Sequence, residues 1–191
     1  TARVERRLAA ILAADVVGYS TLMERNEDRT LARLKAHRRE FVEPLVAERG
    51  GRLVKLMGDG VLAEFASVVD AVRCAVLIQQ RTAERESGTE EEERIRFRIG
   101  VNLGDVIREA DGDLYGDGVN VAARLEQLAE PGGVVVSGTV YDHLQGKLGR
   151  DLEYLGERRL KNIERAVRVY RVTGGVAALP APLALSLPDR P

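Results

Sequence analysis

Two short apolar segments separated by a Gly-Asp-Gly turn constrain the fold of this chain more than any other stretch. Leu53–Met57 and Val61–Phe65 flank Gly58-Asp59-Gly60, and short apolar runs on either side of an Asp-Gly turn are typical of a β-hairpin. The hairpin would carry one carboxylate, Asp59, at its tip and Lys55 in an otherwise apolar strand. A lysine in an apolar strand either extends to solvent or faces a specific partner. The Gly-Asp-Gly turn by itself is also compatible with an ordinary surface loop.

A second apolar segment, Leu8–Val17, stops at Gly18 and predicts a buried central strand. Asp15 is the only charged residue inside it. Because an unpaired carboxylate in a buried strand is costly, we expect Asp15 to lie near the end of the strand. There it would either meet a cation or cap the turn around Tyr19-Ser20.

Four segments have the spacing of apolar residues that is typical of helices. They are Asn26–Arg49, Ser67–Arg85, Asp117–Ala129 and a short segment around Tyr141–Leu144. We expect the first to be one continuous helix that ends at Gly50-Gly51. His37 would lie among the basic residues of its solvated face.

The third of these helices carries two sets of residues on different faces. Val121, Leu125 and Leu128 form its predicted core stripe. Asn120 and Arg124 are four residues apart and therefore project side by side from another face. The apolar stripe and the polar pair are expected to point in different directions.

Further strands are predicted by alternation and by short apolar runs. Ile95–Ile107 alternates apolar and polar residues over its whole length, which indicates one long strand. Three shorter strands are expected at Val134–Ser137, Leu152–Leu155 and Val167–Val172. Glu86–Glu93 is expected to be a solvated acidic loop, and Asp111-Gly112-Asp113 a turn.

The resulting order, βαββαβ followed by further helix and strands, predicts an α+β sandwich of ferredoxin-like type, with two helices on one face of an antiparallel sheet. We expect residues 1–173 to form one domain. From Gly174 to the end, Ala, Pro and Leu alternate without a period, so residues 174–191 are predicted to be a disordered tail or a linker.

Composition excludes several classes of function. The net charge is −1, with 29 basic and 30 acidic residues, so the overall charge does not favour nucleic acid as a partner. No apolar run approaches the ~18 residues that a membrane span needs, and we expect no membrane contact from this segment. One cysteine, Cys74, permits no internal disulfide and fits a reducing compartment. A cytoplasmic location is the expectation.

The predicted topology places the ends of two strands side by side, and with them Asp15 and Asp59. Two carboxylates without a Cys or His cluster favour Mg²⁺ or Mn²⁺ over zinc. Such ions commonly serve phosphate chemistry, and a pair of them can hold the attacking and leaving oxygens of an in-line displacement. The turn Val16–Ser20 would offer backbone N–H groups to a triphosphate.

Three motifs in this order resemble the catalytic domain of the class III adenylyl and guanylyl cyclases. They are Asp15-x-x-Gly-Tyr-Ser, Lys55-x-x-Gly-Asp59-Gly and Asp113-Leu-Tyr-Gly-Asp-Gly-Val-Asn120-Val-Ala-Ala-Arg124-Leu. The third motif is highly specific, and the resemblance extends over roughly residues 8 to 172. Ala13 replaces a common aromatic residue and Val16 a frequent Ile, which affects local packing rather than the ligands.

The resemblance implies a metal site and a phosphate site. Asp15 and Asp59 would hold two Mg²⁺ or Mn²⁺ ions, with the Val16 carbonyl as an additional ligand. The backbone at Gly18 and Tyr19 would contact the phosphates of the substrate.

The resemblance also implies how the nucleotide is recognised. Lys55 and Asp113 would read the purine, as a donor to N1 and an acceptor from the 6-amino group, which selects adenine. Asn120 would orient the ribose and Arg124 would stabilise charge on the α-phosphate. Lys161 matches, less securely, a residue that holds the β- and γ-phosphates.

The activity implied is that of an adenylate cyclase, a phosphorus–oxygen lyase of signal transduction. Attack of the ribose 3′-hydroxyl on the α-phosphorus of ATP would give 3′,5′-cyclic AMP and pyrophosphate. In this family the metal carboxylates come from one domain, and the purine pair, the Asn and the Arg from another. Because one chain carries all of them here, a head-to-tail homodimer with two equivalent sites is implied, and a sensor or effector domain would lie outside this segment.

The same residues bear on alternative functions. A guanylate cyclase typically carries Glu and Cys where this chain has Lys55 and Asp113. A catalytically silent regulatory or dimerisation domain would be expected to lack one of the polar positions, and none is missing. The Gly-Gly-Asp-Glu-Phe signature of diguanylate cyclases is absent, and a metal-binding sandwich without catalysis is the remaining alternative.

Overall fold

The computed structural model of the chain describes residues 4–57, 59–144, 147 and 152–173. Gly58 and the predicted tail 174–191 lie outside these residues. The strands are β1 Glu5–Val16, β2 Arg52–Met57, β3 Gly60–Phe65, β4 Phe97–Arg108, β5 Leu114–Tyr115, β6 Val134–Ser137, β7 Leu152–Arg158 and β8 Val167–Val172. The α-helices are α1 Tyr19–Arg25, α2 Glu27–His37, α3 Glu43–Glu48, α4 Val68–Glu86, α5 Asp117–Leu128 and α6 Gly138–Leu144.

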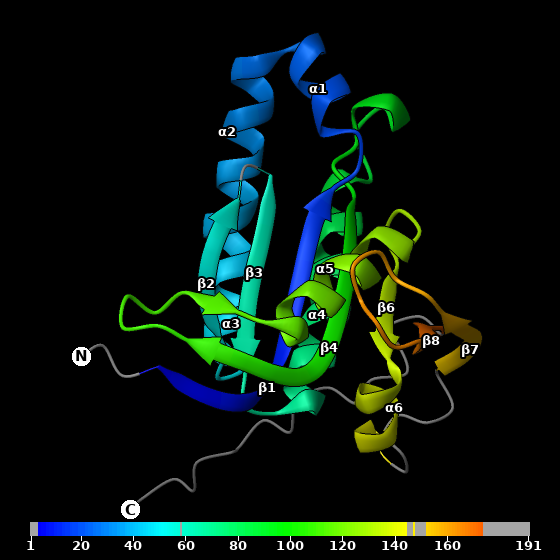
Figure 1. Ribbon diagram of the computed structural model, residues 1–191. Helices are drawn as coiled ribbons and strands as arrows, with labels where there is room; N and C mark the ends of the chain where they lie inside the picture. Colours follow the sequence, from blue (N-terminus) through cyan, green and yellow to red (C-terminus); the bar gives the residue numbers. More distant parts are fainter. Residues whose placement is uncertain (1–3, 58, 145–146, 148–151, 174–191) are drawn as a thin grey trace, which may run out of the picture.

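The strands form one sheet in the order β2-β3-β1-β4-β6-β8-β7, with the short β5 added to β4 (Figure 1). Neighbours are antiparallel except β4 and β6, which are parallel. The first four strands have the order of the ferredoxin-like core, β4-β1-β3-β2, so the predicted α+β fold is confirmed. The β2–β3 hairpin is present, and its neighbour is β1 as predicted.

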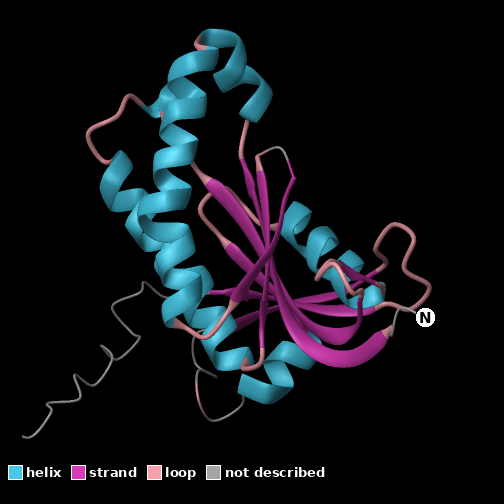
Figure 2. Ribbon diagram, turned by 90° about the vertical axis from the view of Figure 1, so that its left-hand side faces the viewer, coloured by secondary structure: helices cyan, strands magenta, loops and turns pink. Residues whose placement is uncertain are grey.

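Helices cover both faces of this sheet (Figure 2). The largest apolar cluster joins residues of α3, α4 and α6 to one face, and two smaller clusters join α5 to the other. The first two predicted helical segments, Asn26–Arg49 and Ser67–Arg85, lie on one face of the sheet, as expected. The third predicted helix, α5, packs on the opposite face.

Strand β1 is apolar on both sides because both faces of the sheet are covered. Ala10, Leu12 and Ala14 belong to the cluster under α4, whereas Ala9, Ile11 and Ala13 belong to the cluster under α5. Successive side chains of a strand point to opposite faces. Asp15 follows the second set, so its carboxyl faces the side of α5.

The predicted helix over Asn26–Arg49 is found, with helical residues running without a break from Glu27 to Glu48. Asn26 has extended backbone angles (φ −162°, ψ 97°), and its side chain accepts a hydrogen bond from the Arg29 amide at 3.0 Å. This cap begins α2, at the predicted start of the helix, and separates it from the short helix α1. After α2, Arg38–Val42 is π-helical before α3 begins. Asn is a favoured N-cap residue, which explains why the helix starts at this position.

His37 was wrongly expected on a solvated face, since its side chain is only 1% exposed. Its ring packs 4.8 Å from that of Phe41, and its Nε2 lies 3.9 Å from Oε1 of Glu86. Burial lowers the pKa of His37 to about 4, so the ring is neutral at pH 7. Glu86 was expected in the acidic loop, but it ends α4 and is buried against Arg33, 2.6 Å away. These residues lie far apart in sequence and meet only through packing of α2 on α4.

Helix α5 approaches the sheet closely at Gly100 of β4. A Cβ atom placed there would lie 2.4 Å from the amide nitrogen of Glu126 and 2.5 Å from the carbonyl oxygen of Ala122. Both are backbone atoms, which cannot rotate away. Gly100 therefore allows the helix to lie directly against β4.

We predict that Gly100→Ala destabilises the chain by about 2 kcal/mol, because the added methyl group must push α5 off the sheet. Gly88→Ala is the matched control, since a Cβ atom there meets nothing within 4 Å. Urea unfolding of both variants measures the difference. Equal midpoints would contradict the close packing of α5.

Candidate active site

The carboxyl groups of Asp15 and Asp59 lie side by side. Asp15 is near the end of β1, and Asp59 is at the tip of the hairpin, close to the β3 residue that pairs with Ala14. The two carboxyl groups lie close enough for the negative charge of Asp15 to act on Asp59. Burial, together with the hydrogen bond and negative charge of Asp15, raises the pKa of Asp59 to about 6, and backbone hydrogen bonds at Asp59 and Val16 partly oppose this. The expected convergence of these carboxylates is found.

A third carboxyl group, Glu126, adjoins the pair from α5. It is 7% exposed and lies close enough to Asp15 for the two carboxyl groups to interact. Burial, and then the charge of Asp15, raises the pKa of Glu126 to about 7, while Arg98 partly opposes the rise. Arg98 is the β4 partner of Asp15 in the sheet, so its side chain leaves the sheet on the same side.

Glu126 was not predicted as a site residue, because the core stripe of α5 differs from the expected one. Val121 and Leu125 are buried as predicted, but Leu128 is 42% exposed. The buried stripe instead continues from Ala122 to Glu126, four residues on. The signal available in the sequence was a glutamate four residues after Ala122, which is the spacing of residues on one face of a helix.

The carboxylate pair suits a hard divalent cation. Oδ1 of Asp15 is buried and has no hydrogen-bond partner, so it is oriented for a ligand that the protein does not supply. Oxygen donors of this type favour Mg²⁺ or Mn²⁺. No group of three or more His, Cys, Asp or Glu side chains in the described part of the chain could hold a metal ion. The donors that fit are therefore Asp15, Asp59 and backbone oxygen.

The alternative role of Asp15 as a helix cap is not found. The N-cap of α1 is Gly18, and no side chain caps that helix. Gly18 has φ 64°, a left-handed conformation that glycine adopts without strain. Its conformation turns the chain from β1 into α1, and the neighbouring Tyr19 packs its half-buried ring against the main core.

The segments that carry Lys55 and Asp113 are joined by a hydrogen bond and border the same apolar cluster. The Arg52 guanidinium on β2 donates a hydrogen bond of 2.9 Å to the carbonyl oxygen of Gly112. Val54 of β2 packs against the apolar cluster that includes Leu114 of β5. The sequence neighbours of the predicted purine pair are therefore adjacent, although the side chain of Lys55 is not among the described ones.

Asp113 is held by its own neighbours in the chain. Its carboxylate accepts hydrogen bonds from the Leu114 amide at 2.9 Å and from the Tyr115 hydroxyl at 3.0 Å. These bonds fix the carboxylate at the start of β5. The role of Asp113 in reading a purine remains a prediction, as does that of Lys55.

Asn120 and Arg124 lie on the outer side of α5. Asn120 is exposed, and Arg124 is half-buried and donates a hydrogen bond of 3.3 Å to Gln127. The core-facing residue of this turn is Glu126. Lys161 is exposed in the turn before β8, next to the buried Leu160. The roles predicted for Asn120, Arg124 and Lys161 remain predictions.

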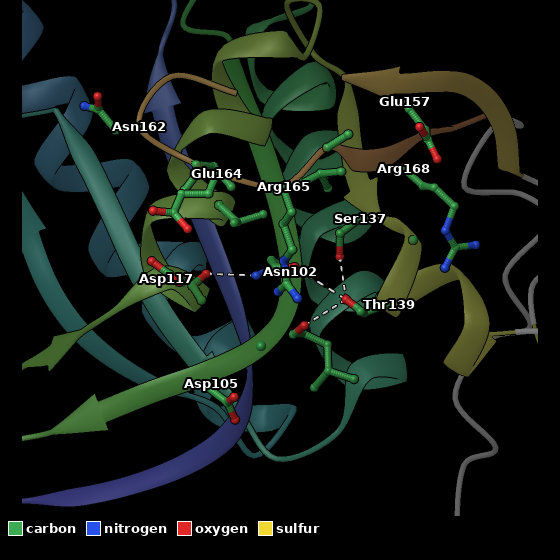
Figure 3. Close-up of a pocket in the computed structure, with 18 residues that line it drawn as sticks. Asn102, Asp105, Asp117, Ser137, Thr139, Glu157, Asn162, Glu164, Arg165 and Arg168 are labelled. Carbon is green, nitrogen blue, oxygen red and sulfur yellow. Dashed lines mark hydrogen bonds between the residues drawn. The ribbon is translucent and has the colours of Figure 1, made fainter. Parts of the chain in front are cut away.

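A cavity of about 770 Å³ lies on another side of α5, between its first turn, the middle of β4, the start of α6 and the loop before β8 (Figure 3). The buried Asn102 donates a hydrogen bond of 3.0 Å to the carbonyl oxygen of Gly118 at its base. Thr139 donates to the Leu103 carbonyl oxygen at 2.7 Å. Its inner polar groups thus bond to one another, and neither Asp15 nor Asp59 lines it.

Residues 5–174 match the family described as the adenylate and guanylate cyclase catalytic domain. The chain therefore belongs to this family, which its fold and paired carboxylates fit. It is 47% identical to the protein named "Putative adenylate cyclase 3" of Rhizobium meliloti, over 98% of this chain and 33% of that protein. It is 37% identical to an adenylate cyclase of Streptomyces coelicolor, over 70% of this chain and 33% of that protein. The chain spans about a third of the length of these relatives.

Solved structures agree with this assignment. An adenylate/guanylate cyclase/hydrolase from Silicibacter pomeroyi is 49% identical, with a TM-score of 0.83 over 90% of this chain and 99% of that one. The adenylyl cyclase CyaB from P. aeruginosa has a TM-score of 0.79 over 91% of this chain and 97% of that one. At 22% identity, the latter shows the shared fold alone. Among the described residues no helix is long and apolar enough to cross a membrane.

We predict that Asp59→Asn stabilises the metal-free chain at neutral pH. The folded chain holds the Asp59 proton up to about pH 6, whereas the ordinary pKa is 3.8. Ionisation therefore destabilises the fold above pH 6 and has no effect below the ordinary pKa. Because Asp59 is only half-buried, we expect a gain of about 1 kcal/mol.

Thermal unfolding in EDTA at pH 8 and at pH 3.5 measures this effect, with the exposed Glu84→Gln as the control for loss of a charge. The gain should be present at pH 8 and absent at pH 3.5. Added Mn²⁺ should stabilise the unsubstituted chain and not the Asp59→Asn variant, since a ligand stabilises only the form that binds it. A variant that is less stable than the parent at pH 8 would contradict the repulsion inferred here.

Proposed function

We propose that the chain is the catalytic domain of an adenylate cyclase that converts ATP to 3′,5′-cyclic AMP and pyrophosphate. The observation that carries the proposal is the adjacent carboxyl pair of Asp15 and Asp59, with a buried unpartnered oxygen. Membership of the cyclase family supports the reaction class. Metal ions at this pair would lower the pKa of the 3′-hydroxyl and neutralise phosphate charge.

The residues around the pair would position the substrate. The main chain at Gly18 and Tyr19 would contact the phosphates, and Lys161 would bind the distal phosphates from the turn before β8. Asn120 would hold the ribose. Arg124 would donate hydrogen bonds to the α-phosphate, where negative charge grows in the transition state.

Preference for ATP over GTP is proposed from Lys55 and Asp113. A lysine ammonium donates to the adenine N1, and an aspartate accepts from the 6-amino group, whereas guanine presents the opposite pattern. A buried edge with mispaired hydrogen-bonding groups is costly. The hydrogen bond from Arg52 to the carbonyl oxygen of Gly112, which joins the segments that carry these two residues, supports the pairing.

The orientation of α5 supports a site shared between two chains. Glu126 of this helix contacts Asp15 of its own chain. At about 100° per residue, Arg124 lies roughly 200° around the helix from Glu126. Arg124 therefore points away from the metal carboxylates of its own chain, and a second chain must supply it to a nucleotide held there. A head-to-tail homodimer with two equivalent sites satisfies this requirement.

The first experiment measures cyclic product from ATP and from GTP, with Mg²⁺ and then with Mn²⁺, over a range of protein concentrations. We expect cyclic AMP, with little cyclic GMP, and a rate per chain that falls on dilution because the dimer dissociates. Cyclic GMP as the main product would favour a guanylate cyclase. Nucleotide binding without either product would favour a regulatory domain.

A mixture of Asp15→Ala and Arg124→Ala chains tests the shared site. Each variant alone should be inactive, because every site lacks one group. In an equal mixture half of the dimers combine the two variants, and each of these has one intact site, so activity should return to about a quarter of that of the parent. No recovery, despite mixed dimers detected by differential tagging, would contradict the arrangement.

A further inference from the structure

We propose that Arg52 is a positioning residue for base recognition, because its guanidinium ties the turn that carries Asp113 to the strand that carries Lys55. The inference rests on the proposed function, in which Lys55 and Asp113 read the purine. It adds a residue that is assigned no contact with the nucleotide but sets the spacing of the two residues that would make one.

The turn between β4 and β5 reaches Arg52 across the face of the sheet. In the sheet β1 and β3 lie between β4 and β2, yet the Arg52 guanidinium donates a hydrogen bond of 2.9 Å to the carbonyl oxygen of Gly112. Figure 1 shows the hairpin of β4 and β5, drawn in green, crossing in front of β2 and β3. The bond to Arg52 therefore connects the tip of a short hairpin to a strand that is not its neighbour in the sheet.

Gly112 lets the guanidinium approach the turn closely. Its φ is 87°, a left-handed conformation that glycine adopts without strain, and a Cβ atom there would lie 3.3 Å from Nη1 of Arg52. The turn is also closed by its own bonds. The Gly112 amide donates to the Glu109 carbonyl oxygen at 2.9 Å, and the Glu109 amide to the Asp113 carbonyl oxygen at 3.0 Å. Because these bonds hold the turn together as one unit, a contact that fixes Gly112 also fixes Asp113.

Arg52 is itself held in place by a buried carboxylate. Its Nε lies 3.3 Å from Oε1 of Glu64, its partner across the β2–β3 ladder. Glu64 is 7% exposed and also pairs with Arg7 of β1. A buried carboxylate needs charged partners, and two arginines share this one. The ion pair through Nε fixes the direction of the Arg52 guanidinium, so that Nη2 is presented to the turn.

A β-bulge gives Lys55 a register position on the same face of β2 as Arg52. Residues three apart in a regular strand lie on opposite faces. In β2 the register shifts between Leu53 and Lys55, so that Arg52 pairs with Glu64 and Lys55 with Leu62. These two partners are two residues apart on β3 and therefore share a face. The bulge thus brings both positions of β2 to the face over which the β4–β5 turn lies.

The test measures the affinities of 3′-deoxy-ATP and 3′-deoxy-GTP by calorimetry, in the presence of Mg²⁺. Both analogues lack the attacking hydroxyl group and cannot be cyclised, so that binding is measured without turnover. We expect the parent to prefer the adenine analogue. Arg52→Met removes both hydrogen bonds of the guanidinium and should lower the ratio of the two affinities about tenfold, because the base-reading groups are no longer held at one spacing.

Arg33→Met is the matched control for loss of a structural arginine. Arg33 also bridges a buried glutamate and a backbone carbonyl oxygen, since it lies 2.6 Å from Glu86 and donates a hydrogen bond of 2.9 Å to the carbonyl oxygen of Glu93. Its loss disturbs the fold in a similar way, on the side of α4. We expect a lower melting temperature in both variants and a changed affinity ratio in Arg52→Met alone.

A second variant, Arg52→Lys, decides the question if Arg52→Met does not fold. Folding of the Met variant is favoured because Glu64 keeps Arg7 as its partner. A lysine at position 52 would retain a positive charge beside Glu64, but it has no planar fork with which to join two partners. The affinity ratio of Arg52→Lys should therefore fall about threefold or more.

The possible outcomes separate the role of Arg52 from base recognition and from activity. A parent-like ratio in the folded Arg52 variants, or an equal fall in Arg33→Met, would overturn the role of Arg52. Equal binding, or no binding, of the two analogues by the parent would overturn base reading by Lys55 and Asp113, and the role of Arg52 with it. A ratio that falls as expected, without cyclic product from ATP or GTP in the parent, would overturn the proposed activity only.

Discussion

The contact between Asp15 and Asp59 is the constraint on which the rest of the site depends. Two like charges at the end of a buried strand repel each other, and burial and this repulsion together raise the pKa of Asp59. A fold selected for stability alone would place apolar groups there. The surrounding sheet keeps the pair together because β1 lies between β3 and β4 and cannot move without breaking both ladders.

Helix α5 connects this pair to the rest of the chain. Its inner stripe lies against β4 and β1, where Gly100 permits backbone contact. Its outer side carries Asn120 and Arg124. In the proposed dimer, one side of α5 thus packs beside the carboxyl pair of one site, and its other side contributes Asn120 and Arg124 to the second site. The ferredoxin-like core does not require a helix on the face opposite to α4. The proposed shared site gives a physical reason for the presence of α5 there.

Most of the fold could be predicted because its signals are local. The hairpin follows from a turn between apolar runs, and the boundaries of β6 and β8 matched their predicted positions. The errors arose where local signals were too short. Helix α1 has seven residues and β5 has two, too few for a periodicity to be recognised.

The sequence by itself determined the strand that bears Asp15, the hairpin turn that bears Asp59, and the spacing of Asn120 and Arg124, because turn chemistry and periodicity act over a few residues. Only the tertiary structure decided which polar groups are buried. His37 and Glu126 look like solvated residues in the sequence, yet each is enclosed by elements distant along the chain. Burial depends on how helices pack on the sheet, and that packing changes both the charge of a side chain and its partner.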